Sequence, residues 1–193
     1  MKSFSKWGSL LVAAALAAMP ALAQEAQKGG PPKPAPGPSQ VVLEAWNDIG
    51  RKLIAIAEDL PEDKYDYKPN PDSRTFLAQL LHVSASMYYF TDSAQGKKPH
   101  LPDDPKREDL HLQTKADVVS FVKKCVQDGA DVIKAKGDKG MNESVVAGGP
   151  TLTRIGDLAF LLAEHSGEHY GQLVVYYRIN GMVPPESRPK PKQ

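Results

Sequence analysis

Two histidines with the spacing of metal ligands lie near the end of the chain. His165 and His169 are four positions apart in LLAEHSGEHYGQLVVYYRING (161–181), a segment that otherwise has the pattern of an apolar helix. Side chains four positions apart lie on one face of a helix, about 5–6 Å from each other. Both imidazoles can then reach one divalent ion through bonds of about 2.0–2.1 Å. The pair therefore predicts two ligands of a metal site.

The periodicity of this helix places both histidines where core residues are expected. Its seam, with spacing 4-3-4-3-4, consists of Leu158, Leu162, His165, His169, Gln172 and Tyr176. A buried imidazole is costly in either form, because a charged ring loses its hydration and a neutral ring needs hydrogen-bond partners. Two such rings at consecutive seam positions favour metal binding over a pair of ordinary core histidines.

The residues alone leave the third ligand open. His100 and His111 fall in the polar connection 94–113 and are predicted to lie at the surface. His82 belongs to a predicted helix, but it lies opposite the apolar seam of that helix. Its position fits either an exposed residue or one that faces a pocket between helices, because its neighbours are small.

Other catalytic patterns fit less well. The stretch 165–169 matches H-x-x-E-H, a protease pattern in which Glu168 would be the general base. Such a protease needs a further acidic ligand far downstream, yet only 193 − 169 = 24 residues follow, with Glu186 as their one acidic residue. Cys125 occupies a seam position and is predicted to be buried core. As the single cysteine, it cannot form an intramolecular disulfide.

Four helical segments must position these residues. Apolar seams and cap signals predict helices from Ser39 to about 59, from 72 or 73 to about 95, from Thr114 to about 137, and from about 151 to Asn180. Asp117 gives the third helix a capping box, and Gly181 is typical of a helix stop. No segment shows a convincing strand pattern. The prediction is an all-α four-helix bundle.

The connections of this bundle are long. They span 60–73, 94–113 and 138–150, and the last contains a predicted turn at 146–150. Connections of this length permit crossovers, and they can form a wall of a pocket at one end of the bundle.

The first residues have the pattern of a secretory signal peptide. Lys2 and Lys6 precede an apolar run at 10–18, and a small-residue cleavage site follows at 21–23. Removal of 1–23 leaves 193 − 23 = 170 residues and changes the formal charge to +1 − 2 = −1. We therefore expect an exported protein, periplasmic or secreted.

The rest of the chain divides by composition. Residues 24–40 are rich in proline and glycine and predict a disordered spacer, 41–185 form the helical domain, and 186–193 are predicted to be a disordered tail. No stretch after the signal peptide is long and apolar enough for a membrane span. The nearly balanced charge, without a basic stripe, argues against a nucleic-acid partner.

Two stretches resemble the DinB-like, damage-inducible family of four-helix proteins. They are DKYDYKPNPDSRTFLAQLLHV (63–83) and EHSGEHYGQLVVYYRINGMVPP (164–185), and the resemblance extends over 41–185. It implies a bundle whose helices are not joined in simple up-down order, and a homodimer. It also implies a divalent metal ion bound by one histidine of the second helix and by the H-x-x-x-H pair. The implied ligands are His82, His165 and His169.

The family includes thiol-dependent S-transferases and a thiol-dependent isomerase. The present chain departs from these members in its signal peptide and spacer. Because low-molecular-weight thiols are cytoplasmic reductants, export argues against a thiol-transferase role. We therefore expect a metal-dependent hydrolase or transferase that acts on a small molecule, with zinc or nickel as the metal. Glu164 and Glu168 are candidates either to accept a proton or to orient a ligand histidine. The alternative is a non-catalytic protein that binds metal or a small ligand.

Overall fold

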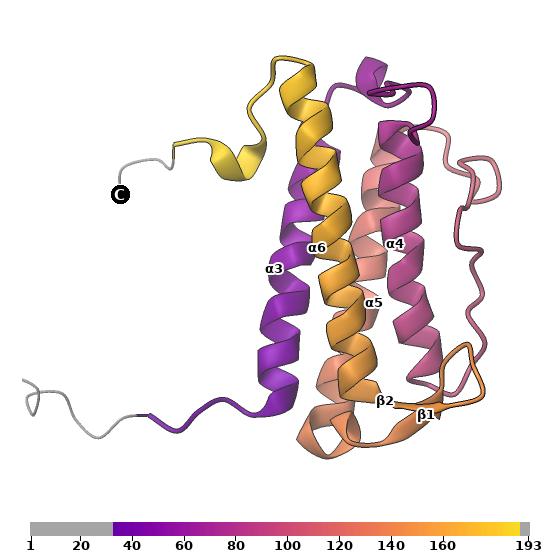
Figure 1. The fold of residues 1–193 in the computed structure, drawn as a ribbon, viewed down its shortest axis with the longest axis vertical. Coiled ribbons are helices and arrows are strands. Elements are labelled where there is room, and N and C mark those ends of the chain that lie inside the picture. Colours follow the sequence, from indigo (N-terminus) through magenta and orange to yellow (C-terminus); the bar gives the residue numbers. More distant parts are fainter. Residues whose placement is uncertain (1–32, 190–193) are drawn as a thin grey trace, which may run out of the picture. The chain divides into compact units, whose positions relative to one another are not determined.

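Four helices packed together form the described part of the chain, as predicted. The computed structural model describes residues 33–189, so the predicted signal peptide and residues 24–32 of the spacer lie outside the described part of the chain. The helices are α3 (Pro38–Asp59), α4 (Phe76–Ser93), α5 (Lys115–Met141) and α6 (Ile155–Ile179) (Figure 1). Shorter elements are the 3-10 turns η1 (Glu62–Lys64) and η2 (Pro185–Ser187) and the strands β1 (Ser144–Val146) and β2 (Leu152–Arg154).

The order of the helices around the bundle differs from their order in the chain. α3 and α4 each pack against α5 and α6, so the consecutive helices α3 and α4 lie across the bundle from each other. α4 and α5 run in the same direction, and the connection between them returns along the length of α4 (Figure 1). The expected crossover is therefore present, and it lies beside α4.

The helix starts follow local capping chemistry. Thr75 caps α4 by accepting a hydrogen bond from the backbone NH of Ala78, and Thr114 forms the predicted capping box with Asp117. The predicted starts at Ser39 and at 72–73 are wrong by a few residues. α3 begins at Pro38, because proline suits a first helical turn, and the Ser39 hydroxyl donates to Asp138 instead.

A short hairpin precedes α6 where the sequence indicated no strands. β1 and β2 are antiparallel, with Val145 opposite Thr153, and the turn between them contains Gly148 at φ 69°. The fourth helix consequently begins at Ile155 rather than near 151. Strands of three residues are too short to produce a recognisable alternation, whereas the predicted turn at 146–150 was visible from its glycines and proline.

The predicted helix stop at Gly181 agrees with the structure, whereas α5 continues past its predicted end near Gly137. Gly137 adopts φ 57° and interrupts α5, although helical turns resume as far as Met141. Gly181, at φ 69°, follows the end of α6.

No helix in the described part of the chain is both long enough and apolar enough to cross a bilayer.

The described segment after α6 contacts α3. Arg188 forms an ion pair with Asp59, and Glu186 forms one with Arg51. Residues 190–193 of the predicted disordered tail lie outside the described residues.

The core is arranged around Trp46, which is fully buried. Its indole NH donates to the backbone oxygen of Val126 at 2.9 Å, and its ring lies 5.1 Å from that of Phe90. A Cβ atom at Gly129 would collide with the indole ring, so α5 can approach Trp46 only with glycine at this position.

We expect Gly129→Ala to lower the free energy of unfolding by about 1–3 kcal/mol, because the added methyl group overpacks the Trp46 site. Gly171→Ala is the matched control: a Cβ there, also within a helix, has no neighbour within 4 Å. That control should be neutral or stabilising by up to about 1 kcal/mol through helix propensity. Urea unfolding measures both, and equal stability of the two variants would contradict the packing argument.

Candidate metal centre

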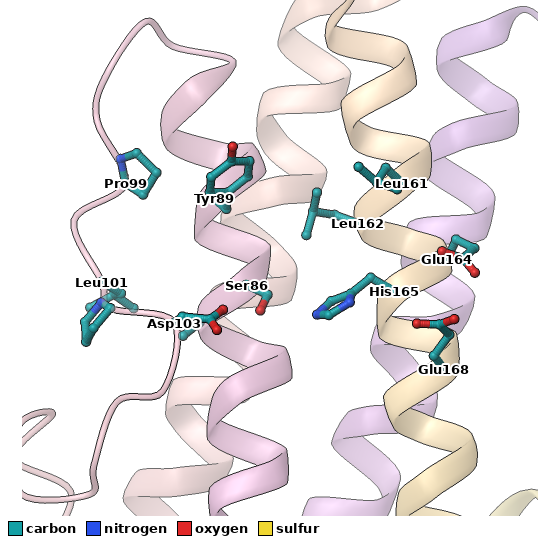
Figure 2. A pocket seen from close by; sticks show the side chains of 12 residues that line it. Ser86, Tyr89, Pro99, Leu101, Asp103, Leu161, Leu162, Glu164, His165 and Glu168 are labelled. Atoms are coloured by element: carbon teal, nitrogen blue, oxygen red, sulfur yellow. The ribbon is translucent and has the colours of Figure 1, made fainter. Parts of the chain in front are cut away.

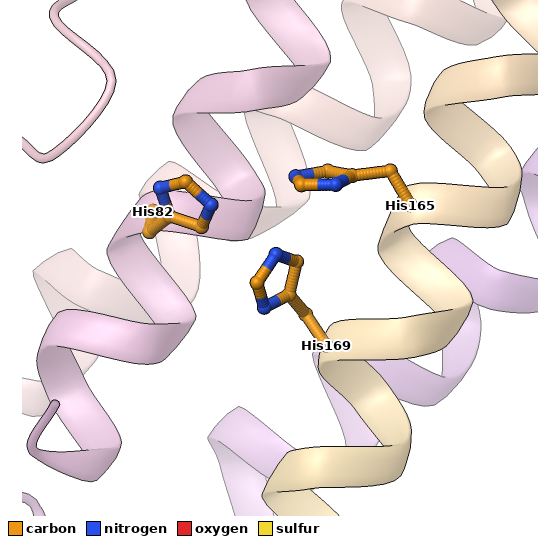
Figure 3. Close-up of side chains that lie close together, drawn as sticks. All are labelled: His82, His165 and His169. Atoms are coloured by element: carbon orange, nitrogen blue, oxygen red, sulfur yellow. The ribbon is translucent and has the colours of Figure 1, made fainter. Parts of the chain in front are cut away.

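Three histidines from two adjacent helices meet at one point. His82 projects from α4, and His165 and His169 project from α6 (Figure 3). The ring centroids of His165 and His169 are 4.3 Å apart, and those of His82 and His169 are 4.6 Å apart. One nitrogen of each ring lies within 4.8 Å of a nitrogen of the other two. The structure thus brings together the three predicted ligands.

The other two histidines lie outside the cluster, as predicted from their polar connection. Both are exposed. His100 is bound to Asp92, which its Nδ1 approaches at 2.6 Å, and His111 adopts φ 54° in the same connection.

His82 is buried although it lies opposite the apolar seam of its helix. His82 is only 4% exposed. All but two of the 18 residues of α4 are buried, because the bundle covers one side and residues of the α4–α5 connection reach the other. A helix covered in this way has no solvent-facing side at His82, which explains why its periodicity could not decide the matter.

The seam predicted for α6 is displaced by about one residue. The residues at 0% exposure along this helix are Ile155, Ala159, Ser166, Leu173 and Tyr177. His165 is only partly buried and Gln172 is exposed, whereas His169 is 7% exposed. The histidines therefore lie along the flank of the core stripe that faces α4, where a ligand can reach them.

A backbone oxygen determines the orientation of His82. Its Nδ1 lies 2.8 Å from the carbonyl oxygen of Asp103 and must donate to it, because a carbonyl only accepts. The carboxylate of Asp104 is 3.3 Å from the same nitrogen and also pairs with Arg74. With the proton held at Nδ1, Nε2 carries the lone pair that a metal ion requires.

Gln79 gives His169 a polar partner. Its amide nitrogen contacts Nδ1 of His169 and also donates to Oε1 of Gln172 at 2.6 Å. If His169 binds a metal ion through Nε2, its Nδ1 carries a proton, and the Gln79 amide must then turn its oxygen towards the ring. Gln79 was not among the residues predicted from the sequence, although its position three residues before His82 places both on one side of α4.

Burial keeps the histidines of α6 neutral. Desolvation, followed by the adjacent His165 and His82, lowers the pKa of His169 to about 4. Desolvation and then His82 also lower the pKa of His165. Neutral imidazoles offer the lone pairs that bind metal ions. At neutral pH these rings are therefore free to bind a metal ion, because protons do not occupy the lone pairs.

A cavity of about 580 Å³ adjoins the cluster at His165. It lies between α4, α6 and the α4–α5 connection (Figure 2). Its wall includes the candidate proton acceptors Glu164 and Glu168, together with Asp103 and Ser86. Neither glutamate is hydrogen-bonded to a site histidine within the described residues, so both border the cavity rather than orient the rings.

The chain is similar to known proteins at the level of family and fold. A family model described as the DinB superfamily matches residues 45–173. The crystal structure of the DinB-like protein YjoA from Bacillus subtilis superposes with a TM-score of 0.58 at 20% identity and covers 74% of this chain and 92% of its own. A DinB-like protein from Bacillus cereus gives a TM-score of 0.60 at 14% identity, with 75% and 93% covered. No curated protein is significantly similar to the chain.

The lowered pKa of His169 predicts an acid-sensitive apoprotein. The pKa of His169 falls on folding from 6.5 to about 4, so the unfolded chain takes up this proton at a higher pH than the folded chain. The contribution of neutral His169 to stability is therefore fully present above pH 6.5 and is lost as the pH falls towards about 4. With chelator present, we expect the free energy of unfolding to fall by about 1–2 kcal/mol between about pH 7.5 and about pH 5.

His169→Gln should reduce this pH dependence, because glutamine does not titrate in the range. His111→Gln, which changes an exposed histidine, is the control and should leave the dependence as in the parent chain. Denaturant titrations at the two pH values provide the measurement, and the same slope in the parent and in His169→Gln would contradict the assignment.

Proposed function

Because the chain belongs to the DinB superfamily and gathers three histidines at one point, we propose that it binds one divalent metal ion and hydrolyses a small molecule with it. The ligands would be Nε2 of His82 and one nitrogen each of His165 and His169. The observation that carries the proposal is the cluster itself, whose ligand nitrogens already lie within 4.8 Å of one another.

The donor set fits a metal ion. Three nitrogens at about 2.0–2.1 Å from one tetrahedral ion lie about 3.3 Å from each other, so small side-chain rotations suffice. Three protein ligands with a remaining open position are typical of catalytic zinc sites, whereas structural sites use four. Imidazole suits zinc and nickel, the metals we favour.

When bound, such an ion supplies Lewis-acid chemistry and a nucleophile at neutral pH. The chain's own residues would then position the substrate and move protons. The cavity beside His165 has the size of a small-molecule site, and the carboxylates of Glu164, Glu168 and Asp103 lie on its wall. A carboxylate there can accept the proton that the attacking group loses.

One observation favours a non-catalytic alternative. Among the described residues, no carboxylate other than those near Nδ1 of His82 is held against the cluster, so no general base is fixed in place. A protein that only binds a metal ion or a small ligand needs no such base. The experiments below distinguish the hydrolase from a protein that only binds metal or ligand and from a thiol transferase.

Export and assembly remain part of the proposal. The predicted signal peptide supports a periplasmic or secreted protein that begins at Gln24, and the family resemblance supports a homodimer. N-terminal mass spectrometry of the native protein and sedimentation of the purified chain address these two points.

We expect purified chain without a histidine tag to carry up to one divalent ion, as measured by elemental analysis. Alanine at His82, His165 or His169 should weaken metal binding by at least about tenfold, because each removes one of three ligands. His100→Ala and His111→Ala are matched controls that should bind as the parent does. Equal metal content in the parent and in His165→Ala/His169→Ala would contradict the site.

Activity should follow the metal. For a hydrolase, turnover of an ester or amide panel should be lost with chelator and return when zinc or nickel is restored. A requirement for added thiol would instead identify a transferase. If metal-loaded protein turns over no substrate of either kind, yet metal raises its melting temperature, the binding alternative replaces the hydrolase.

A further inference from the structure

The cavity beside His165 has two chemically distinct parts. One part is apolar and is formed by Tyr89, Pro99, Leu101, Leu161 and Leu162. Leu161 is 55% exposed, so part of this apolar surface is open to a ligand. A volume of about 580 Å³ with such walls can take the hydrocarbon body of a small organic ligand.

The other part offers hydrogen-bond acceptors and negative charge. Asp103, Glu164 and Glu168 contribute carboxylates, which accept and do not donate. Ser86 is 8% exposed, and its hydroxyl donates its one proton to the backbone oxygen of His82 at 2.9 Å. The Ser86 oxygen, which faces the cavity in Figure 2, therefore presents only lone pairs to a ligand.

The described residues in the cavity wall leave this negative charge uncompensated. Among the described residues that line it there is no lysine or arginine. Neither Glu164 nor Glu168 forms an ion pair within the described part of the chain, and the Asp103 carboxylate lies 3.6 Å from Nδ1 of His82.

We propose that this cavity binds an amphipathic organic cation. An ammonium group lies beside Glu164 and Glu168, where it donates hydrogen bonds to groups that can only accept, and Asp103 adds negative charge on the opposite wall of the cavity. The hydrocarbon body lies against Tyr89, Leu101 and Leu162. The substrate class is then an ester or amide that carries an amine, with its reacting group beside His165, and this last step rests on the proposed function.

A metal ion at the histidines would add positive charge at one end of the cavity. An anionic ligand, such as a small carboxylate or an acidic thiol, is therefore the competing class. The two classes differ in their dependence on Glu164 and Glu168, because these side chains would attract a cation and repel an anion.

The test uses three probes of matched size and different charge: phenylbutylamine, phenylbutanol and phenylbutyrate. Their binding to the mature chain is measured by NMR titration, with and without one equivalent of zinc. We expect the amine to bind about three- to tenfold more tightly than the alcohol, since two or three exposed charge contacts are each modest, and the carboxylate to bind most weakly.

Glu164→Gln/Glu168→Gln should remove most of the amine's advantage and leave the affinity for the alcohol within about twofold. The control is Glu44→Gln/Glu108→Gln, which makes the same change in net charge at exposed positions outside the cavity. This control should retain the preference for the amine. Added salt should weaken the amine's binding more than the alcohol's.

Three outcomes overturn the proposal: equal affinity for all three probes, tightest binding of phenylbutyrate, or the same loss of amine binding in the control variant. Zinc titrations of the same samples keep the two ideas separate. Stoichiometric zinc binding without selective amine binding rejects the ligand class and leaves the metal site, whereas selective amine binding without zinc binding rejects the proposed function alone.

Discussion

The path of the chain between α4 and α5 is the constraint on which the site depends. These helices run in the same direction, so residues 94–114 must travel back along the bundle, and they do so beside α4 (Figure 1). The connection is held there by two contacts with its middle: the hydrogen bond from His82 to the oxygen of Asp103, and the ion pair between Arg74 and Asp104. The same segment buries His82, orients its ring and supplies one wall of the cavity.

The cluster combines groups that are unfavourable to bury one by one. Three imidazoles in mutual contact lose hydration, and a proton on one disfavours a proton on the next, as the low pKa of His169 indicates. Polar partners from outside the cluster offset part of this cost, namely Gln79 at His169 and Asp103 at His82. A metal ion that bound the folded chain would offset more of it, and would add its binding free energy to the stability of the fold.

α6 serves the core and the site with different sides of one helix. Its fully buried stripe, which includes Ser166 and Leu173, packs in the bundle, and the hydroxyl of Ser166 is satisfied by its own helix through the oxygen of Leu162. The adjacent side presents His165 and His169 to α4. Because one rigid helix positions both histidines, their separation is insensitive to motion of the connections.

Local patterns in the sequence were enough to identify the helices, the capping box at Thr114, the stop at Gly181 and the His165–His169 pair. Each depends on residues within a few positions of one another, where helix geometry is fixed by the backbone. The hairpin before α6 was missed because its strands are short. Periodicity left the third ligand open, because nothing near His82 in sequence reveals what covers it, and only the family resemblance pointed to His82. Only the packing of α4 against α6, and the return of residues 94–114 over α4, brought His82, Asp103 and Gln79 to the pair, since burial and contacts between distant segments are properties of the assembled fold.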